Sequence, residues 1–233
     1  IVFAKKRDEL LKYCLKKAQI EPNNLDCIAF YEEPYVKLDR LIETQTIYAP
    51  FHFFRNYKRV KNWINNKLNV EQQIDKALPT FKGKLIFYHH HLSHAASAFY
   101  PSPFKRASIL TVDGIGEWAC SSISIGEGNQ LDMRYEQRFP HSVGLLYSAF
   151  TQYIGFKVDS GEYKLMGLAP YGKPIYVDKI KEHLVKVNSD GSIVLDTDYF
   201  DFMVGSRMIS EKFQDLFGGP AKTTDTPPTQ KEM

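Results

Sequence analysis

Cysteine is scarce in this chain, which has only three in 233 residues: Cys14, Cys27 and Cys120. They are odd in number and form no paired spacing motif. This excludes a secreted scaffold held by disulfides and indicates a reducing, cytoplasmic environment. Long apolar runs are also missing, so we expect no segment that crosses a bilayer. No signal peptide is recognisable at the N-terminus.

An excess of charge of either sign is absent as well. Thirty Lys and Arg residues are nearly balanced by twenty-seven Asp and Glu residues, for a formal charge of +3. We therefore expect neither a nucleic-acid partner nor an anionic membrane. A local basic cluster is interpreted as a solvated helix face; it comprises Arg55, Lys58, Arg59 and Lys61.

Neither end of the chain resembles a natural terminus. The sequence opens on Ile1 without an initiator methionine and stops at Met233 after a polar, proline-containing stretch. We expect the chain to be part of a longer protein. Further catalytic residues would then lie outside it.

Hydrophobic spacing predicts alternating helices and strands. The predicted helices cover residues 7–18, 143–154 and 176–187, and residues 38–78 are predicted to be mostly helical. The predicted strands cover residues 25–31, 84–88, 108–112, 119–125 and 131–139, the last three forming a meander. Ser142 is expected to cap the second helix and Gly155 to end it. The pattern predicts an α/β fold with two halves that meet near the Pro101-Ser102-Pro103 segment.

Three consecutive histidines begin another predicted helix, which runs until Pro101. The four-residue spacing of His90 and His94 places two imidazoles on one helix face, which is a common way to build a metal site. The positive end of the helix disfavours imidazolium and favours the neutral rings that bind metals. The alternative is that these histidines form part of a solvated surface.

Asp113 directly follows the apolar strand at 108–112, and two glycines, at 114 and 116, come after it. Gly114 and Gly116 allow positive φ and close backbone approach, so their amides can face a phosphate while Asp113 faces a cation. An ordinary Asp-Gly hairpin turn is the alternative.

A third segment, residues 159–173, is rich in glycine and in residues that bind phosphate. Backbone amides near Gly161 and Gly167 can approach an anion, with Lys164 as its charge partner and Glu162 orienting the lysine or binding a ribose hydroxyl. The segment has neither the Walker spacing nor the Rossmann glycine fingerprint. Taken alone, it also fits a tight loop between helices.

Four motifs together resemble the nodulation-type O-carbamoyltransferase family. They are HHLSHAASAFY at 90–100, VDGIGEW at 112–118, FPHSVGLLY at 139–147 and GEYKLMGLAPYG at 161–172. The resemblance covers almost the whole chain. It implies a ribonuclease-H-like or actin-like two-lobed domain, similar to the one that transfers threonylcarbamoyl groups to tRNA. The lobes would be residues 1–106, with the helical insert at about 38–78, and residues 107–233, both incomplete.

The resemblance also implies ligands and partners. His90, His94 and Asp113 match three metal ligands of the family, and a fourth, an aspartate, would lie beyond Met233. The first strand of the fold would precede Ile1. A C-terminal domain that makes carbamoyladenylate from carbamoyl phosphate and ATP would also lie outside the chain. The isolated fragment is therefore expected to be inactive.

The implied reaction transfers a carbamoyl group from carbamoyladenylate to a hydroxyl of a small molecule. A metal and Lys164 would stabilise the charge on the departing AMP, and two histidines with a carboxylate favour iron(II), with manganese or zinc as alternatives. His91 is a candidate base, as is His141, although both also fit structural roles. Residues 38–78 are the expected source of acceptor specificity.

Two rival functions use the same residues. An actin-like nucleotide-binding regulatory module would bind ATP without carbamoyl chemistry, but such modules usually hold magnesium with carboxylates. A metal-dependent hydrolase would need a glutamate beside the metal, and the residues between His90 and His94 are His, Leu and Ser.

Overall fold

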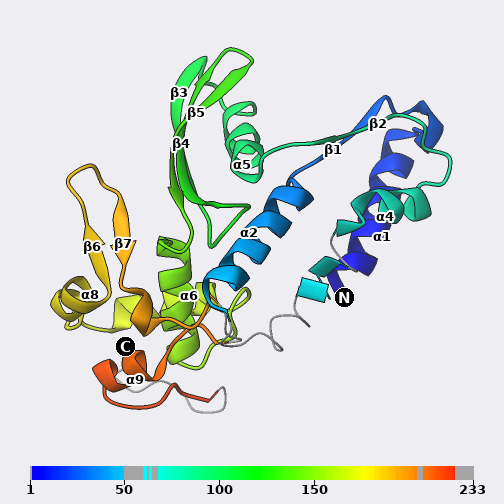
Figure 1. Ribbon diagram of the computed structural model, residues 1–233. Coiled ribbons are helices and arrows are strands. Elements are labelled where there is room, and N and C mark those ends of the chain that lie inside the picture. Colours follow the sequence, from blue (N-terminus) through cyan, green and yellow to red (C-terminus); the bar gives the residue numbers. More distant parts are fainter. Residues whose placement is uncertain (1, 50–59, 62, 65–67, 204–206, 224–233) are drawn as a thin grey trace.

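The computed structural model of the chain describes residues 2–49, 60–61, 63–64, 68–203 and 207–223 (Figure 1). The chain contains both helices and strands, so the predicted mixed α/β class is confirmed. The basic cluster at 55–61 and the middle of the predicted helical insert lie largely outside the described residues. No helix in the described part of the chain has the length and apolar character needed to span a bilayer.

Two parallel strands organise the N-terminal part of the chain. Helix α1 (Val2–Ala18) and the short η1 (Pro22–Asn24) precede β1 (Cys27–Phe30), which pairs in parallel with β2 (Lys84–Phe87). Helices α2 (Pro34–Ile47) and α4 (Val70–Ala77) lie between them in sequence. Parallel strands end at the same sheet edge, so α2 after β1 and α5 (His90–Phe99) after β2 begin close together.

The predicted meander is confirmed as a three-stranded antiparallel sheet. It consists of β3 (Arg106–Val112), β4 (Ala119–Glu127) and β5 (Gln130–Arg138), in that spatial order. Helix α5 packs against this sheet (Figure 1), where Ala95 and Phe99 form a small core with Ile109. This packing brings the histidines of α5 to the end of β3.

The main core lies beyond the meander. Three helices come first: α6 (Val143–Tyr153), α7 (Glu162–Leu168) and α8 (Val177–His183), with the short η3 (Ala169–Tyr171) between α7 and α8. The hairpin of β6 (Val185–Val187) and β7 (Ile193–Leu195) follows, and then the short η4 (Thr197–Tyr199). Helix α9 (Glu211–Phe217) contributes Phe213, which is fully buried beside Leu184 and Ile209. Ser142 caps α6 by accepting the Leu145 N–H, as predicted.

Two local predictions were wrong. The helix predicted for residues 176–187 ends at His183, because the β-branched Val185 and Val187 pair with β7 across the turn at 189–191. The glycine-rich segment at 159–173 is not a simple loop, since most of it forms α7 and η3.

His141 connects the loop before α6 to the hairpin. Its Nδ1 accepts the N–H of Leu195 at 3.1 Å, and burial lowers its pKa below the usual value. The folded state therefore favours neutral His141, and the stability from this group is lost as the pH falls from about 6.5 toward the folded-state pKa. This bond supports a structural role for His141.

We expect His141→Asn to reduce the pH dependence of stability. The Asn side-chain oxygen can accept the same N–H without titrating, whereas protonated His141 loses a hydrogen bond that contributes on the order of 1 kcal/mol. Urea unfolding at pH 7.5 and 5.5 measures the effect, with His183→Asn on α8 as the matched control. Equal losses of stability in the wild type and in both variants would contradict the assignment.

Candidate metal centre and adjoining cavity

Three predicted metal ligands meet where α5 packs against the end of β3. The Nε2 atom of His90 lies 2.8 Å from Oδ2 of Asp113 and 3.0 Å from Nε2 of His94. Nε2 of His94 is 3.8 Å from the same Asp113 oxygen. The i and i+4 positions on one helix face therefore converge on one carboxylate, as the spacing predicted.

The donor set fits a divalent cation. With metal–ligand bonds of about 2.1 Å, neighbouring ligands are separated by about 3.0 Å in octahedral and about 3.4 Å in tetrahedral geometry. The three separations here, 2.8, 3.0 and 3.8 Å, span those values. Two imidazole nitrogens that lie close to each other and to one carboxylate oxygen resemble the two-histidine, one-carboxylate ligand set that binds iron(II).

The pKa of His90 is shifted in the opposite direction from the one that the helix end favours. The hydrogen bond between Asp113 and His90 raises the pKa of His90 more than burial lowers it, and the same bond holds the pKa of Asp113 at about 2. The positive end of α5 was expected to keep His90 neutral. A carboxylate in direct contact outweighs that partial charge.

A buried glutamate, Glu117, fixes the start of α5. Its Oε1 accepts the backbone N–H of His90 at 3.2 Å and that of Glu33 at 2.6 Å, and its Oε2 lies 3.2 Å from Nδ1 of His89. One carboxylate thus anchors the starts of both α5 and α2. Glu117 belongs to one of the motifs but received no predicted role. Its position just after Gly116, in the turn that follows Asp113, was the available signal.

Gly116 packs directly against a metal-ligand candidate. A Cβ atom at this position would lie 2.8 Å from Cδ2 of His90, so any side chain would displace the imidazole. Of the two properties that glycine allows here, Gly116 uses close approach, whereas neither Gly114 nor Gly116 is among the positive-φ residues. Their amides already donate to Oδ1 of Asp113 and to the carbonyl of Ala119. Only glycine at position 116 leaves room for the imidazole of His90.

Helix α6 holds the turn that carries Asp113. The hydroxyl of Ser142 donates to the carbonyl of Gly114 at 2.7 Å and lies 3.3 Å from that of Asp113. A Cβ atom at Gly144 would lie 2.5 Å from the Asp113 carbonyl oxygen. The backbone of α6 therefore packs against the turn so closely that only glycine fits at 144.

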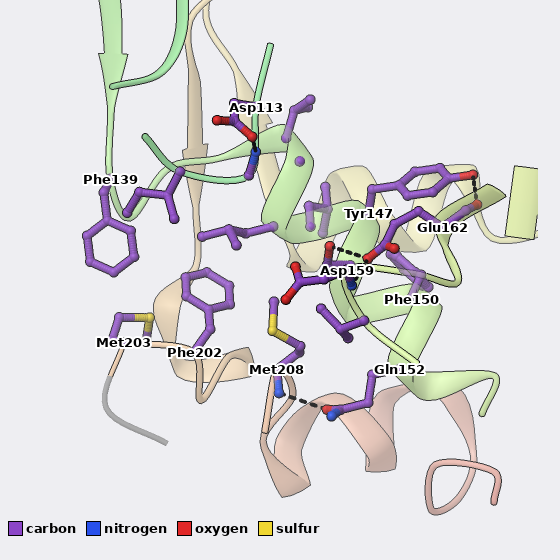
Figure 2. Close-up of a pocket in the computed structure, with 18 of the residues that line it drawn as sticks. Asp113, Phe139, Tyr147, Phe150, Gln152, Asp159, Glu162, Phe202, Met203 and Met208 are labelled. Carbon is purple, nitrogen blue, oxygen red and sulfur yellow. Dashed lines mark hydrogen bonds between the residues drawn. The ribbon is translucent and has the colours of Figure 1, made fainter. Parts of the chain in front are cut away.

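A cavity of about 1420 Å³ extends from this turn along α6. Figure 2 shows Asp113 at one end and Gln152 at the other, with Phe202 and Glu162 on opposite sides. Residues of α2 also line it. The cavity is large enough for a nucleotide-sized molecule, and it joins the second and third of the predicted chemical segments, those of Asp113 and Glu162.

Of the third segment, Glu162 faces the cavity. Its carboxylate accepts the hydroxyl of Ser148 at 2.9 Å and the backbone N–H groups of Asp159 and Gly161 at 3.0 and 3.1 Å. Burial alone would raise the pKa of Glu162, but these hydrogen bonds lower it below the usual value. The Gly161 amide, one of those predicted to bind an anion, is occupied by this carboxylate.

Lys164 and Gly167 lie elsewhere. Lys164 is exposed, with its Nζ 5.9 Å from the ring centroid of Phe156, and a Cβ atom at Gly167 would meet nothing within 4 Å. Among the described lining residues of the cavity, Glu162 is present but Lys164, Gly161 and Gly167 are not. The structure thus brings together Asp113, Gly114 and Glu162, and leaves the predicted lysine outside.

His91 points in a different direction from His90. It is 2% exposed and its Nδ1 lies 2.9 Å from the hydroxyl of Ser122 on β4. Burial lowers its pKa. A direct proton transfer would require substrate to reach a nearly inaccessible ring, so the geometry favours a positioning role that holds α5 against the sheet.

Comparison with known proteins agrees with these motifs. The family model described as the carbamoyltransferase N-terminus matches residues 4–232. The chain belongs to the carbamoyltransferase N-terminal family. This confirms the family that the four motifs indicated.

Relatives in this family are considerably longer. An uncharacterized protein of Synechocystis sp. is 48% identical over 230 residues, which cover 96% of this chain and 37% of that protein. Nodulation protein NolNO of Sinorhizobium fredii is 33% identical over 169 residues, which cover 70% of this chain and 23% of that protein. The chain thus spans less than two fifths of the length of either relative.

We expect the metal affinity of the chain to depend on all three ligand candidates. Substituting His90, His94 or Asp113 by alanine should weaken iron(II) binding at least about tenfold, since even residues behind metal ligands contribute that much. Anaerobic equilibrium dialysis followed by elemental analysis measures this, with His183→Ala as the control. Unchanged iron binding in all three variants would contradict the site.

Proposed function

We propose that the chain is part of a longer carbamoyltransferase, which transfers a carbamoyl group from carbamoyladenylate to a hydroxyl of a small molecule. The carbamoyladenylate is formed from carbamoyl phosphate and ATP by a further domain of the same protein. The observation that carries the proposal is the convergence of His90 and His94 on Asp113, which also lines a nucleotide-sized cavity, in a chain of this family.

The proposed reaction exchanges one bond for another. The acceptor oxygen forms a bond to the carbamoyl carbon, the bond from that carbon to the phosphate oxygen breaks, and AMP leaves with the electron pair. The hydroxyl proton passes to a base that lies outside this chain. A divalent cation, iron(II) by preference over manganese or zinc, would stabilise the negative charge on the leaving phosphate.

The residues of the chain have separate proposed roles. His90, His94 and Asp113 hold the cation. Glu117 positions the start of the helix that carries the two histidines, and Ser142 positions the turn that carries Asp113. Glu162 shapes the far wall of the cavity through its bonds to the loop before α7, and we propose that it orients the ribose.

The predicted role of Lys164 is retained in weaker form. Its exposed position on α7 suits contact with the part of a nucleotide that projects from the cavity, or with another domain. Gly161 is required by packing, since a Cβ atom there would lie 2.6 Å from the carbonyl oxygen of Lys157.

We also propose a two-lobed actin-like architecture for this part of the protein. The first lobe covers residues 1–106 and the second residues 107–233, so the boundary falls at the beginning of β3. The parallel pair β1–β2 and the antiparallel meander β3–β5 support this division, because they are separate sheets. The protein is proposed to act in the cytoplasm on small-molecule substrates.

The alternative is a nucleotide-binding module without transfer chemistry. The cavity suits either function, but a pair of imidazoles beside it favours the transferase, because magnesium–nucleotide sites prefer oxygen ligands.

The test is AMP release by the full-length protein. With carbamoyladenylate, iron(II) and glycerol or glucose as simple hydroxyl acceptors, we expect AMP release above the buffer rate. Asp113→Asn should lower this rate about a hundredfold or more, because the variant keeps its shape but loses the ligand charge. Chromatography of AMP and of carbamoylated acceptor measures both products.

Asp132→Asn is the matched control, since Asp132 lies on β5 and pairs only with exposed Arg134 in the contacts described. Tight binding of ATP together with AMP release at the buffer rate, in the presence of every acceptor tried, would contradict transfer and favour the binding module.

A further inference from the structure

The cavity beside Asp113 has a buried cation in its wall. Arg40, on α2, is 7% exposed and lines the cavity together with Leu41 and Thr44 from the same helix. Arginine is rarely buried to this degree, because desolvating its charge is unfavourable. Arg207, the other cation among the described lining residues, is exposed and pairs with Asp201 at 3.4 Å.

An aromatic ring fixes the orientation of Arg40. The Cζ atom lies 5.3 Å from the centroid of the Phe139 ring, and Phe139 packs in turn on Phe202 with the ring centroids 6.1 Å apart. A cation over a ring face is attracted to it, so this contact restricts where the guanidinium of Arg40 lies. Guanidinium N–H groups form a planar fork that can bind two phosphate oxygens.

The charge of Arg40 acts at the same end of the cavity as Asp113. Burial raises the pKa of Cys120 to about 11, while the positive charge of Arg40 opposes this rise and the carboxylate of Asp113 adds to it. Cys120 is the direct neighbour of Asp113, whose backbone N–H donates to the Cys120 carbonyl at 2.8 Å. Both charged groups are therefore close enough to Cys120 to influence its thiol.

We propose that Arg40 is the phosphate-binding residue of the cavity and recognises the phosphate of the adenylate donor. This rests on the proposed function, to which it adds a specificity-determining residue from a helix that precedes all four motifs. A guanidinium can bind two phosphate oxygens at once, and in a partly buried site such a charge-assisted pair is stronger than in water. Arg40 would hold the same phosphate as it leaves with AMP.

The test compares two probes that differ only in phosphate. Calorimetric titration of the full-length protein with AMP and with adenosine gives a ratio of affinities. We expect Arg40→Gln to weaken AMP binding about 10- to 100-fold and to leave adenosine binding unchanged, because only the phosphate contact is lost. Arg40→Lys should recover part of the AMP affinity, since it keeps the charge but not the paired donors.

Arg207→Gln is the control for an exposed charge in the lining of the same cavity and should change neither affinity by more than about twofold. Equal weakening of AMP and adenosine in Arg40→Gln would overturn the proposal, because it would mean that Arg40 only supports the packing of α2. An unchanged affinity for AMP would overturn it as well.

AMP release from carbamoyladenylate separates this proposal from the function. If the wild type transfers carbamoyl groups but Arg40→Gln binds AMP normally, the assignment of Arg40 fails and the function stands. If Arg40 sets the preference for AMP over adenosine but no carbamoyl transfer occurs, the phosphate site stands and the transferase function fails.

Discussion

The contact between Asp113 and His90 is the interaction on which the proposed site depends. It joins the end of a strand in the antiparallel sheet to the first turn of a helix that follows the parallel pair, so it ties the two sheets of the chain together. Both side chains are partly buried, with 15% of His90 and 32% of Asp113 exposed. The arrangement of the pair is constrained on every side, by Gly116 against the imidazole, by Glu117 at the start of α5 and by Ser142 under the turn. Such support is typical of ligands that must be held ready for a cation.

The chemistry of the cavity follows from how its charges are distributed. Asp113, which contacts the two histidines, lies at one end, and the buried Arg40 lines the cavity from α2. Glu162 is already engaged by a hydroxyl and two amides, and Asp159 and the exposed Arg207 also line the cavity. A bound divalent cation and Arg40 would give this end of the cavity a positive character that suits a phosphate. The apolar residues of α2 and α6 between these groups would accommodate the uncharged part of a nucleotide.

Local patterns in the sequence predicted much of this arrangement. The i, i+4 histidines, the carboxylate at the end of an apolar strand and the Ser142 cap are short-range features, and each lies where the pattern placed it. The predictions failed where tertiary contacts decide the outcome. Val185 and Val187 fit the helical pattern of the residues before them, but they form β6 and pair with β7. The Gly161 amide donates to Glu162, its neighbour in sequence. Arg40 and Glu117 were missed because a single charged residue in an amphipathic helix or turn has no pattern of its own. Only the fold shows that both are buried.

X-ray absorption at the iron edge is the most direct test of the metal centre. In full-length protein loaded anaerobically with iron(II), the account predicts a first shell at about 2.1 Å that contains two imidazole nitrogens, identified by their outer-ring scattering, together with oxygen ligands. His94→Ala should lower the imidazole contribution to one ring without removing the oxygen shell. A spectrum of the wild type that contains oxygen ligands alone would contradict a site built from His90, His94 and Asp113.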